Sequence, residues 1–348
     1  MNSRIQSFIE AAGWPRIIIG LFLVSLFVAA PFVGVRIDTS LSDTLVRVGM
    51  NGVMVLALVP MVQSGCGLNF GLPLGIIAGL VGAVTSIEMN ALGMMGFFVA
   101  LLISVPLAVL LGYGYGLLLN RVKGDEMMIA TYVGFSSVAV MCMAWLLLPY
   151  KSPTMIWGYG GAGLRTTISV EGFWLHILSD FLHVQIGKFF YFPTGMFLFF
   201  ALMCFLMWGF LHTKTGTAMT AVGSNPEFAR ASGINVDRMR IVSVVLSTVL
   251  GAVGILVYQQ SFGFIQLYMG PFYMAFPAVA AILLGGASVN KASMLNVVVG
   301  TFLFQGILTM TPSVINSLIQ TDMSEVIRII VSNGMILYAL TRKVQVKR

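Results

Sequence analysis

Residues 93–119 read GMMGFFVALLISVPLAVLLGYGYGLLL and contain no charged side chain. An apolar run of about 20 residues is long enough to cross the hydrocarbon core of a bilayer as an α-helix. Including this one, the chain has ten such runs, at residues 17–35, 46–62, 71–87, 93–119, 127–148, 192–212, 241–260, 271–284, 294–310 and 325–341. The pattern predicts an all-α, polytopic membrane protein of about ten transmembrane helices. The run at 271–284 is short and contains Pro277, so a half-span or a tilted element fits it as well.

The composition agrees with a chain whose surface faces lipid. Hydrophobic residues make up 58% of the 348 residues and charged residues only 9%, whereas a soluble domain carries roughly a quarter charged residues. The 38 Gly and 23 Met fit helices that pack closely in lipid. We therefore predict one transmembrane domain over residues 1–348, with no separate soluble domain.

Basic residues are unevenly distributed between the two sides of the predicted bundle. If the ten runs alternate across the membrane and the N-terminus is cytoplasmic, 13 of the 19 Lys and Arg fall in inside segments. Cytoplasmic loops of membrane proteins carry such an excess, so both termini are expected in the cytoplasm. The same residues are scattered over several loops, which argues against a nucleic-acid surface as the reason for the net charge of +7.

Two connections are longer than turns. The outer one, residues 149–191, contains apolar residues at helical spacing over 173–184, which predicts an amphipathic helix along the outer membrane surface. Trp145, Trp157, Tyr150 and Tyr159 around its start are interpreted as an interfacial aromatic belt. The inner connection, residues 213–240, is polar and charged, and a solvated linker is one interpretation of it.

The inner connection has the pattern of two short helices with a break between them. Gly223 suits the end of a first helix, and Ser224 or Asn225 can cap a second one whose first position is Pro226. Gly233 would end that second helix. Exposed residues of such a helix pair are available to a partner: Glu227 in the first turn, Phe228 for an apolar pocket and Arg230 for a carboxylate.

This connection resembles the coupling-helix region of permeases of the branched-chain amino acid, ribose and nucleoside group of ABC importers. The resemblance lies in Ala-Val-Gly-x-Asn-Pro-Glu-x-Ala-Arg-x-x-Gly-Ile at 221–234, and it extends to 246–254 and to 279–286, with Thr248 where the family usually has Gly. It implies ATPase coupling through Gly223, Asn225, Pro226, Glu227, Phe228, Arg230 and Gly233. It also implies a bacterial cytoplasmic (inner) membrane and four kinds of partner: a second permease chain, identical or homologous, two ATP-binding-cassette ATPases, an extracytoplasmic substrate-binding protein, and the bilayer. ATP and Mg would bind to the ATPases, with no cofactor bound by this chain.

A glycine-rich stretch, residues 65–71, separates the apolar run 46–62 from the next one and resembles the corresponding stretch of the same permeases. Exposed backbone at membrane depth is tolerated only where protein or water surrounds it, so we expect this stretch to line a pathway. A tight cytoplasmic turn is the alternative. Its Asn69-x-Gly71 form resembles the nucleoside branch, whereas residues 128–131 resemble sugar permeases, so both substrate classes stay open.

Uncharged polar residues within or beside the runs are candidate contacts for a hydroxylated solute, because an amide binds hydroxyl groups without the cost of a buried ion. The candidates are Asn51, Gln63, Asn69, Thr131, Gln305 and Asn333. For any one of them, a hydrogen bond between helices is the simpler interpretation.

Catalysis by this chain has little support. His176, His183 and His212 form no metal-binding or triad spacing, and Cys66, Cys142 and Cys204 are interpreted as core thiols, so neither an enzyme nor a metal site is expected. The chain lacks Gly-x-x-x-x-Gly-Lys-Ser/Thr, which assigns ATP hydrolysis to other polypeptides. The functional alternative is a self-sufficient secondary carrier or channel for a small solute, although no predicted span carries the deeply placed charged residue typical of ion-coupled carriers.

Overall fold

The computed structural model describes residues 14–157, 163–288, 291–319 and 323–341. Within them the chain is a helical bundle with four short strands. Its helices are α2 (Trp14–Ala29), the 3-10 turn η1 (Ala30–Val33), α3 (Ile37–Leu56), α4 (Val59–Gln63), α5 (Leu72–Glu88), α6 (Gly93–Arg121), α7 (Glu126–Leu147), α8 (Thr194–Leu211), α9 (Lys214–Ser224), α10 (Pro226–Ala231), α11 (Val236–Phe262), α12 (Gly270–Leu284), α13 (Met294–Ile319) and α14 (Ser324–Thr341). Its strands are β1 (Thr167–Ser169), β2 (Val184–Ile186), β3 (Phe190–Phe192) and β4 (Phe264–Gln266), paired antiparallel as β1 with β4 and β2 with β3.

Each of the ten apolar runs is mostly helical, as predicted, although the run at 46–62 is divided between α3 and α4 and the run at 17–35 continues from α2 into η1. By length and hydropathy, seven membrane-crossing candidates are found among the described helices, whereas α5 and α12 are apolar but shorter. The expected count of about ten spans is therefore not confirmed. Pro277 lies inside α12 without ending it, because the helix continues to Leu284.

The core of the bundle forms around α11, which packs against α3, α5 and α6. Fully buried side chains from these elements meet there, among them Val53, Leu72, Ile76 and Ile255. A second apolar cluster joins α2 to α13 through Leu23 and Ile307. In contrast, α6 directs Met95, Leu102 and Leu110 outward, and such large exposed apolar side chains fit a surface that faces lipid.

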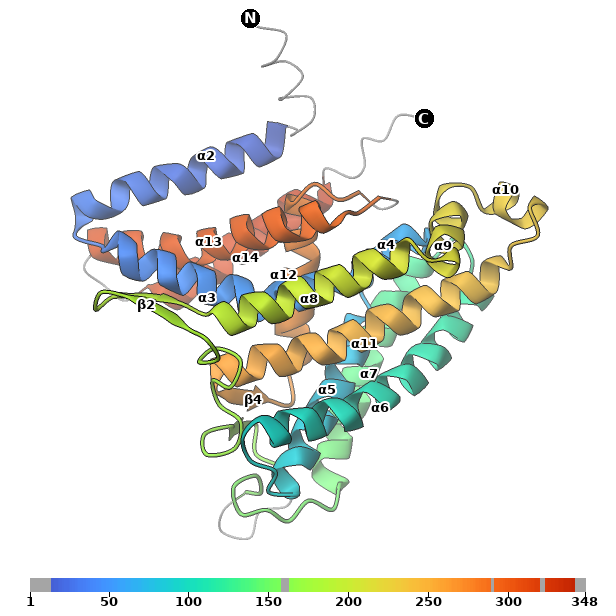
Figure 1. Ribbon diagram of the computed structural model, residues 1–348, viewed down its shortest axis with the longest axis horizontal. Coiled ribbons are helices and arrows are strands. Elements are labelled where there is room, and N and C mark those ends of the chain that lie inside the picture. The colour runs from blue at the N-terminus through green and yellow to red at the C-terminus, as the bar shows by residue number, and fades with distance from the viewer. Residues whose placement is uncertain (1–13, 158–162, 289–290, 320–322, 342–348) are drawn as a thin grey trace, which may run out of the picture.

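The two long connections lie at opposite ends of the bundle. Figure 1 shows α9 and α10, in yellow, at one end, whereas β2 and β4 lie at the other. The residues that carry the two termini, 1–13 and 342–348, are outside the described residues, so the predicted cytoplasmic location of the termini stays a prediction.

The predicted amphipathic helix over 173–184 is wrong. The segment forms a series of turns, because His176 (φ 55°) and Leu182 (φ 52°) adopt left-handed backbone conformations that interrupt a helix. Its apolar residues Trp174 and Leu178 are buried against the bundle and do not face lipid. At Trp174 and Leu178 the apolar spacing reflects packing onto the protein, whereas Phe181 and Leu182 are exposed.

The predicted aromatic belt is also incorrect in part. Trp145 is fully buried in the core cluster, whereas Trp157 is exposed. Tyr150 is half-buried and bonds to Thr85 through its hydroxyl, at 2.9 Å. Tyr159 lies outside the described residues. Burial of Trp145 removes it from any interfacial role.

Candidate functional site

The helix pair α9–α10 is built by a succession of caps. The Thr213 hydroxyl accepts from the Gly216 amide (3.2 Å) at the start of α9, and Asn225 Oδ1 accepts from the Phe228 amide (3.0 Å) at the start of α10. Pro226 occupies the first position of α10, where its missing N–H has no cost. Gly233, at φ +80°, turns the chain toward α11. The predicted pattern of helix, break and helix is confirmed, with Asn225 as the cap.

One prediction about this pair is wrong. Gly223 does not end α9 with a positive φ, because α9 continues through Ser224. Gly223 instead lies against the chain after α4: a Cβ added to it would collide with the carbonyl oxygen of Gln63 and approach the Gly65 nitrogen at 2.9 Å. The glycine is required for close approach and not for a turn.

The pair has a buried side and an exposed side. Met219, Val222 and Ala229 are buried against α11 and its neighbours. Glu227 and Arg230 are exposed, and Phe228 shows 66% of its surface. An exposed phenylalanine between two charged residues on a short, capped helix is suited to contact with a partner.

The stretch against which α9 packs is the glycine-rich interruption between α4 and α5. Residues 64–71 are irregular, and their polar side chains bond to neighbouring helices. The Ser64 and Ser243 hydroxyls lie 2.7 Å apart, Asn69 Nδ2 donates to Ser247 Oγ (2.7 Å), and the Tyr115 hydroxyl donates to Asn69 Oδ1 (3.2 Å). The interruption is therefore enclosed by α6 and α11, as non-helical backbone would have to be if it lay inside a membrane.

The comparisons with known proteins agree with this arrangement. A family described as the permease component of branched-chain amino acid transport systems matches residues 40–339. The chain belongs to this permease family. As a member with several long apolar helices, this permease is a multi-pass membrane protein.

Two relatives of the permease show what similar proteins do. The chain is 27% identical over 216 residues to the autoinducer 2 import system permease protein LsrC of Escherichia coli, covering 61% of this chain and 60% of LsrC. It is 25% identical over 243 residues to the nucleoside ABC transporter permease protein NupB of Lactococcus lactis, covering 65% of this chain and 61% of NupB. The chain thus spans about 60% of the length of these relatives. No solved structure matches it.

The six candidate pathway residues of the permease do not gather around one cavity. Gln63 ends α4 just before the interruption and donates to the Ala292 carbonyl, and Asn69 lies within the interruption. Asn51 and Thr131 bond to carbonyls of their own helices, those of Arg47 and Met127. Gln305 is buried in α13, and Asn333 is exposed on α14. Their role in a pathway stays a prediction.

One polar residue escaped the sequence reasoning. Gln259 of α11 is fully buried, and neither its Nε2 nor its Oε1 has a hydrogen-bond partner among the described residues. A buried, unpaired amide costs about 1–3 kcal/mol, so its retention points to a partner outside the isolated chain, such as water, a solute or a second subunit. Its position inside the apolar run 241–260 was the available signal.

A partly buried ion pair lies at the same end of the permease as α9–α10. Arg240 of α11 bonds to Glu126 at the start of α7, and their side chains are 12% and 14% exposed. Glu126 also lines a pocket of about 350 Å³ with Gly65, Cys66 and Gly67. The pair therefore connects the wall of this pocket to the helix that follows α10. Among the described residues, no cluster of three or more His, Cys, Asp or Glu forms a metal site, and the three cysteines are free.

Proposed function

We propose that this permease is the transmembrane subunit of an ABC importer, forming the translocation pathway for a small polar metabolite. The observation that carries the proposal is the exposed α9–α10 pair, which rests through Gly223 on the interruption between α4 and α5. A surface element that contacts a membrane-embedded irregular segment is placed to transmit motion into the bundle. The names of LsrC, an import system permease, and of NupB, an ABC transporter permease, support the same class.

In this proposal, two ATP-binding-cassette ATPases dock on the α9–α10 pairs of two permease chains. Phe228 would enter an apolar pocket of the ATPase, with Glu227 and Arg230 paired to charges around it. ATP and Mg belong to the ATPases, and the energy of transport comes from the different affinity of ATP for the two states of the assembly.

The remaining partners follow from the same assignment. The α9–α10 end faces the cytoplasm of a bacterium, the strand-bearing end faces outward, and both termini are cytoplasmic. An extracytoplasmic binding protein delivers the solute to the strand-bearing end. We assign three polar residues to the pathway. Gln63 and Asn69 lie on or beside the enclosed interruption, and Gln259 has an unpaired amide within the bundle.

The solute class that fits best is a simple sugar or a nucleoside. Uncharged amides and hydroxyls dominate the buried polar groups, which suits a neutral, hydroxylated solute. NupB is a nucleoside permease by name, which supports the same class.

Purification of the tagged permease from its own cells in mild detergent tests the proposal. We expect an ATP-binding-cassette ATPase to co-purify and to be identified by mass spectrometry. Proteoliposomes holding that assembly and the binding protein should accumulate solute only when ATP is supplied to the ATPase side. Solute uptake by the permease alone, driven by an ion gradient, would instead establish a secondary carrier.

A further inference from the structure

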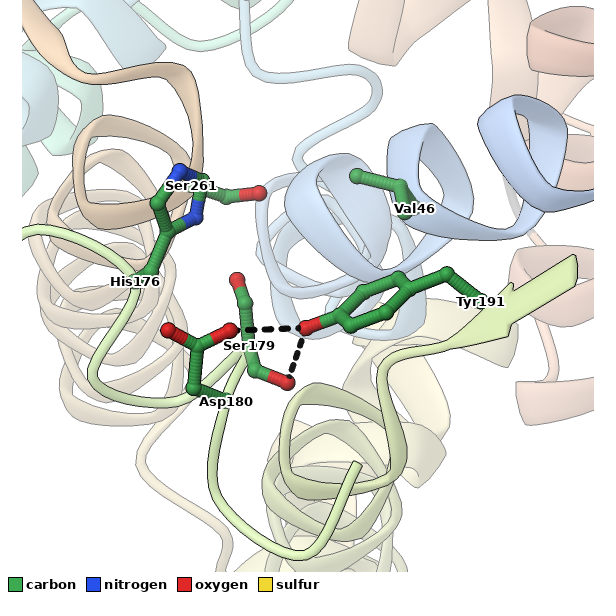
Figure 2. A pocket seen from close by; sticks show the side chains of 6 residues that line it. All are labelled: Val46, His176, Ser179, Asp180, Tyr191 and Ser261. Atoms are coloured by element: carbon green, nitrogen blue, oxygen red, sulfur yellow. Dashed lines mark hydrogen bonds between the residues drawn. The ribbon is translucent and has the colours of Figure 1, made fainter. Parts of the chain in front are cut away.

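A second pocket, of about 330 Å³, opens at the strand-bearing end, away from the α9–α10 pair. Figure 2 shows its lining around one space, with Ser261 and His176 on one side and Tyr191 on the other. The lining residues are Val46 of α3, His176, Ser179 and Asp180 of the turns over residues 171–182 (the outer turns), Tyr191 of β3 and Ser261 of α11. Four separate segments of the chain thus meet at this pocket.

One wall is fixed to α11 by Gln260. The Gln260 carbonyl accepts from the His176 amide (2.7 Å), and its side-chain Oε1 accepts from the Leu178 amide (3.1 Å) and from the Ser179 hydroxyl (3.5 Å). These bonds hold His176 in its left-handed conformation (φ 55°), which is uncommon for a residue other than glycine. Backbone strain of this kind is maintained where the surroundings over-determine it, often at ligand sites.

The other wall is fixed by Tyr191. Its backbone pairs with the Ser42 hydroxyl of α3, which donates to the Tyr191 carbonyl (2.7 Å) and accepts from its amide (3.1 Å). Its phenol donates to the Ser179 carbonyl (2.5 Å) and to Asp180 Oδ1 (3.1 Å). Burial, followed by the Asp180 carboxylate, raises the pKa of Tyr191, so the phenol stays protonated and keeps Asp180 in place.

Polar groups of this fixed pocket lack partners. Ser261 is only 9% exposed, and its hydroxyl has no hydrogen-bond partner among the described residues. Asp180 and His176 are exposed, and Asp180 Oδ2 and the His176 ring make no hydrogen bond within the described part of the chain, so both are free to turn to a ligand, whereas Asp180 Oδ1 is engaged. A buried, unpaired hydroxyl is costly, so Ser261 is suited to a ligand that enters the pocket.

We propose that this pocket is an outer binding site for a small neutral solute with vicinal hydroxyls, of the size of a pentose or of the ribosyl end of a nucleoside. Asp180 accepts from one or two hydroxyls, Ser261 and His176 donate to or accept from another, and Val46 contacts the carbon skeleton. The volume is at the small end of ligand pockets, which favours a single sugar ring. Use of this site in import rests on the proposed function, whereas binding itself does not.

The experiment uses the full-length permease alone in lipid nanodiscs, with no ATPase, and saturation-transfer NMR with D-ribose as the probe. We expect saturation transfer to D-ribose, with at least about five-fold weaker transfer to 2-deoxy-D-ribose, which lacks one of the vicinal hydroxyls. Uridine should show stronger transfer to its ribose protons than to its base protons. Ser261→Ala and Asp180→Asn should each remove most of the D-ribose signal.

Two exposed residues outside the pocket supply matched controls. Ser169→Ala on β1 and Glu171→Gln just after it should leave the signal unchanged, and the melting temperature of each variant verifies its fold. Absence of transfer to D-ribose, equal transfer in all variants, or binding of putrescine in place of D-ribose would overturn the proposal. Co-purification of an ATPase without D-ribose binding would remove this site and leave the importer proposal standing, and D-ribose binding without any ATPase would do the reverse.

Discussion

Gly223 of α9 and Gly65 after α4 are in backbone contact: a Cβ added to Gly65 would lie 3.0 Å from the Cα of Gly223. Each residue has no side chain, so the two backbones approach more closely than any other pair of residue types would allow. Through this contact, a helix at the surface of the bundle touches the irregular segment that leads into α5.

Substitution of Gly223 by Ala tests the importance of this contact. The new Cβ would collide with the Gln63 carbonyl, so we expect a loss of about 1–3 kcal/mol in the free energy of unfolding and a marked loss of uptake. Gly114→Ala in α6 is the control, because a Cβ there meets no atom within 4 Å. The melting temperature in nanodiscs and uptake in cells measure the two effects. Equal behaviour of the two variants would show that the close approach has no role.

Charge reversal at Arg230 tests the docking surface. If α10 contacts an ATPase, Arg230→Glu should abolish uptake and weaken ATPase co-purification, since leaving the partner of a desolvated charge unpaired costs about 2–5 kcal/mol. Membrane insertion should be unchanged. Lys214→Glu, an exposed residue at the start of α9, should be mild. Normal uptake by Arg230→Glu with its ATPase still attached would contradict the assignment of α9–α10 as the coupling element.

The described residues include two ion pairs that join α11 to the segment 123–126, which leads from the α6–α7 connection into α7, and these pairs allow a direct comparison. Glu126–Arg240 is mostly buried, whereas Lys123–Asp237, at 2.7 Å, has side chains 46% and 53% exposed. We expect Glu126→Gln to lower the free energy of unfolding by about 1–3 kcal/mol because it leaves Arg240 unpaired. Lys123→Gln should cost less than about 1 kcal/mol. Melting temperatures of both variants provide the measurement, and a larger effect at Lys123 would reverse the interpretation.

Gln259 offers a test that separates stability from function. Gln259→Met removes an unpaired amide from the core, so we expect a melting temperature equal to or above that of the wild type together with reduced uptake. Asn69→Leu is the contrasting variant, because both ends of the Asn69 amide are bonded and its loss should destabilise the protein. A Gln259→Met permease with normal uptake would show that this amide contacts nothing during transport.

Cysteine labelling tests the orientation. After replacement of Cys66, Cys142 and Cys204 by Ala, a cysteine at Glu171 should react with an impermeant maleimide added to intact cells, and one at Ser224 only after the membrane is opened. Both positions are exposed, so accessibility within the fold does not limit either reaction. Labelling at Ser224 from outside would invert the topology and remove α10 from the cytoplasm.

The sequence predicts most helices of this fold because a bilayer demands long apolar runs and leaves them visible. It is less informative where a helix continues through polar residues. The apolar run that marks α3 starts at residue 46, yet α3 begins at Ile37, since Ser40 and Thr44 are buried and the Thr44 hydroxyl bonds to the Ser40 carbonyl within the same helix. Local caps such as Asn225 were predictable because they depend on neighbouring residues only.

Contacts between distant segments could not be predicted from the sequence. Glycine is the residue type typical of a helix end, so the sequence favours that role for Gly223. Only its contact with Gly65 in the structure reveals a packing role. In the sequence, the outer turns have the pattern of a helix because Trp174 and Leu178 recur at helical spacing. In the structure, Gln260 bonds to His176 and Leu178, and the segment forms turns. In both cases tertiary contacts overrode the local pattern.

Helix α11 runs without proline from Val236, just after α10, to Phe262 beside β4. Its 27 residues span about 40 Å, so a tilt of about 5° about one end would move the other by about 3.5 Å. A displacement of that size exceeds the range of a hydrogen bond and would separate His176 from Gln260 unless the outer turns moved too. Such a tilt would make the helix a lever arm between the two ends of the bundle. By thermodynamic reciprocity, if a solute at one end and a partner at the other each prefer one tilt of this helix, each must alter the binding affinity of the other by the same factor.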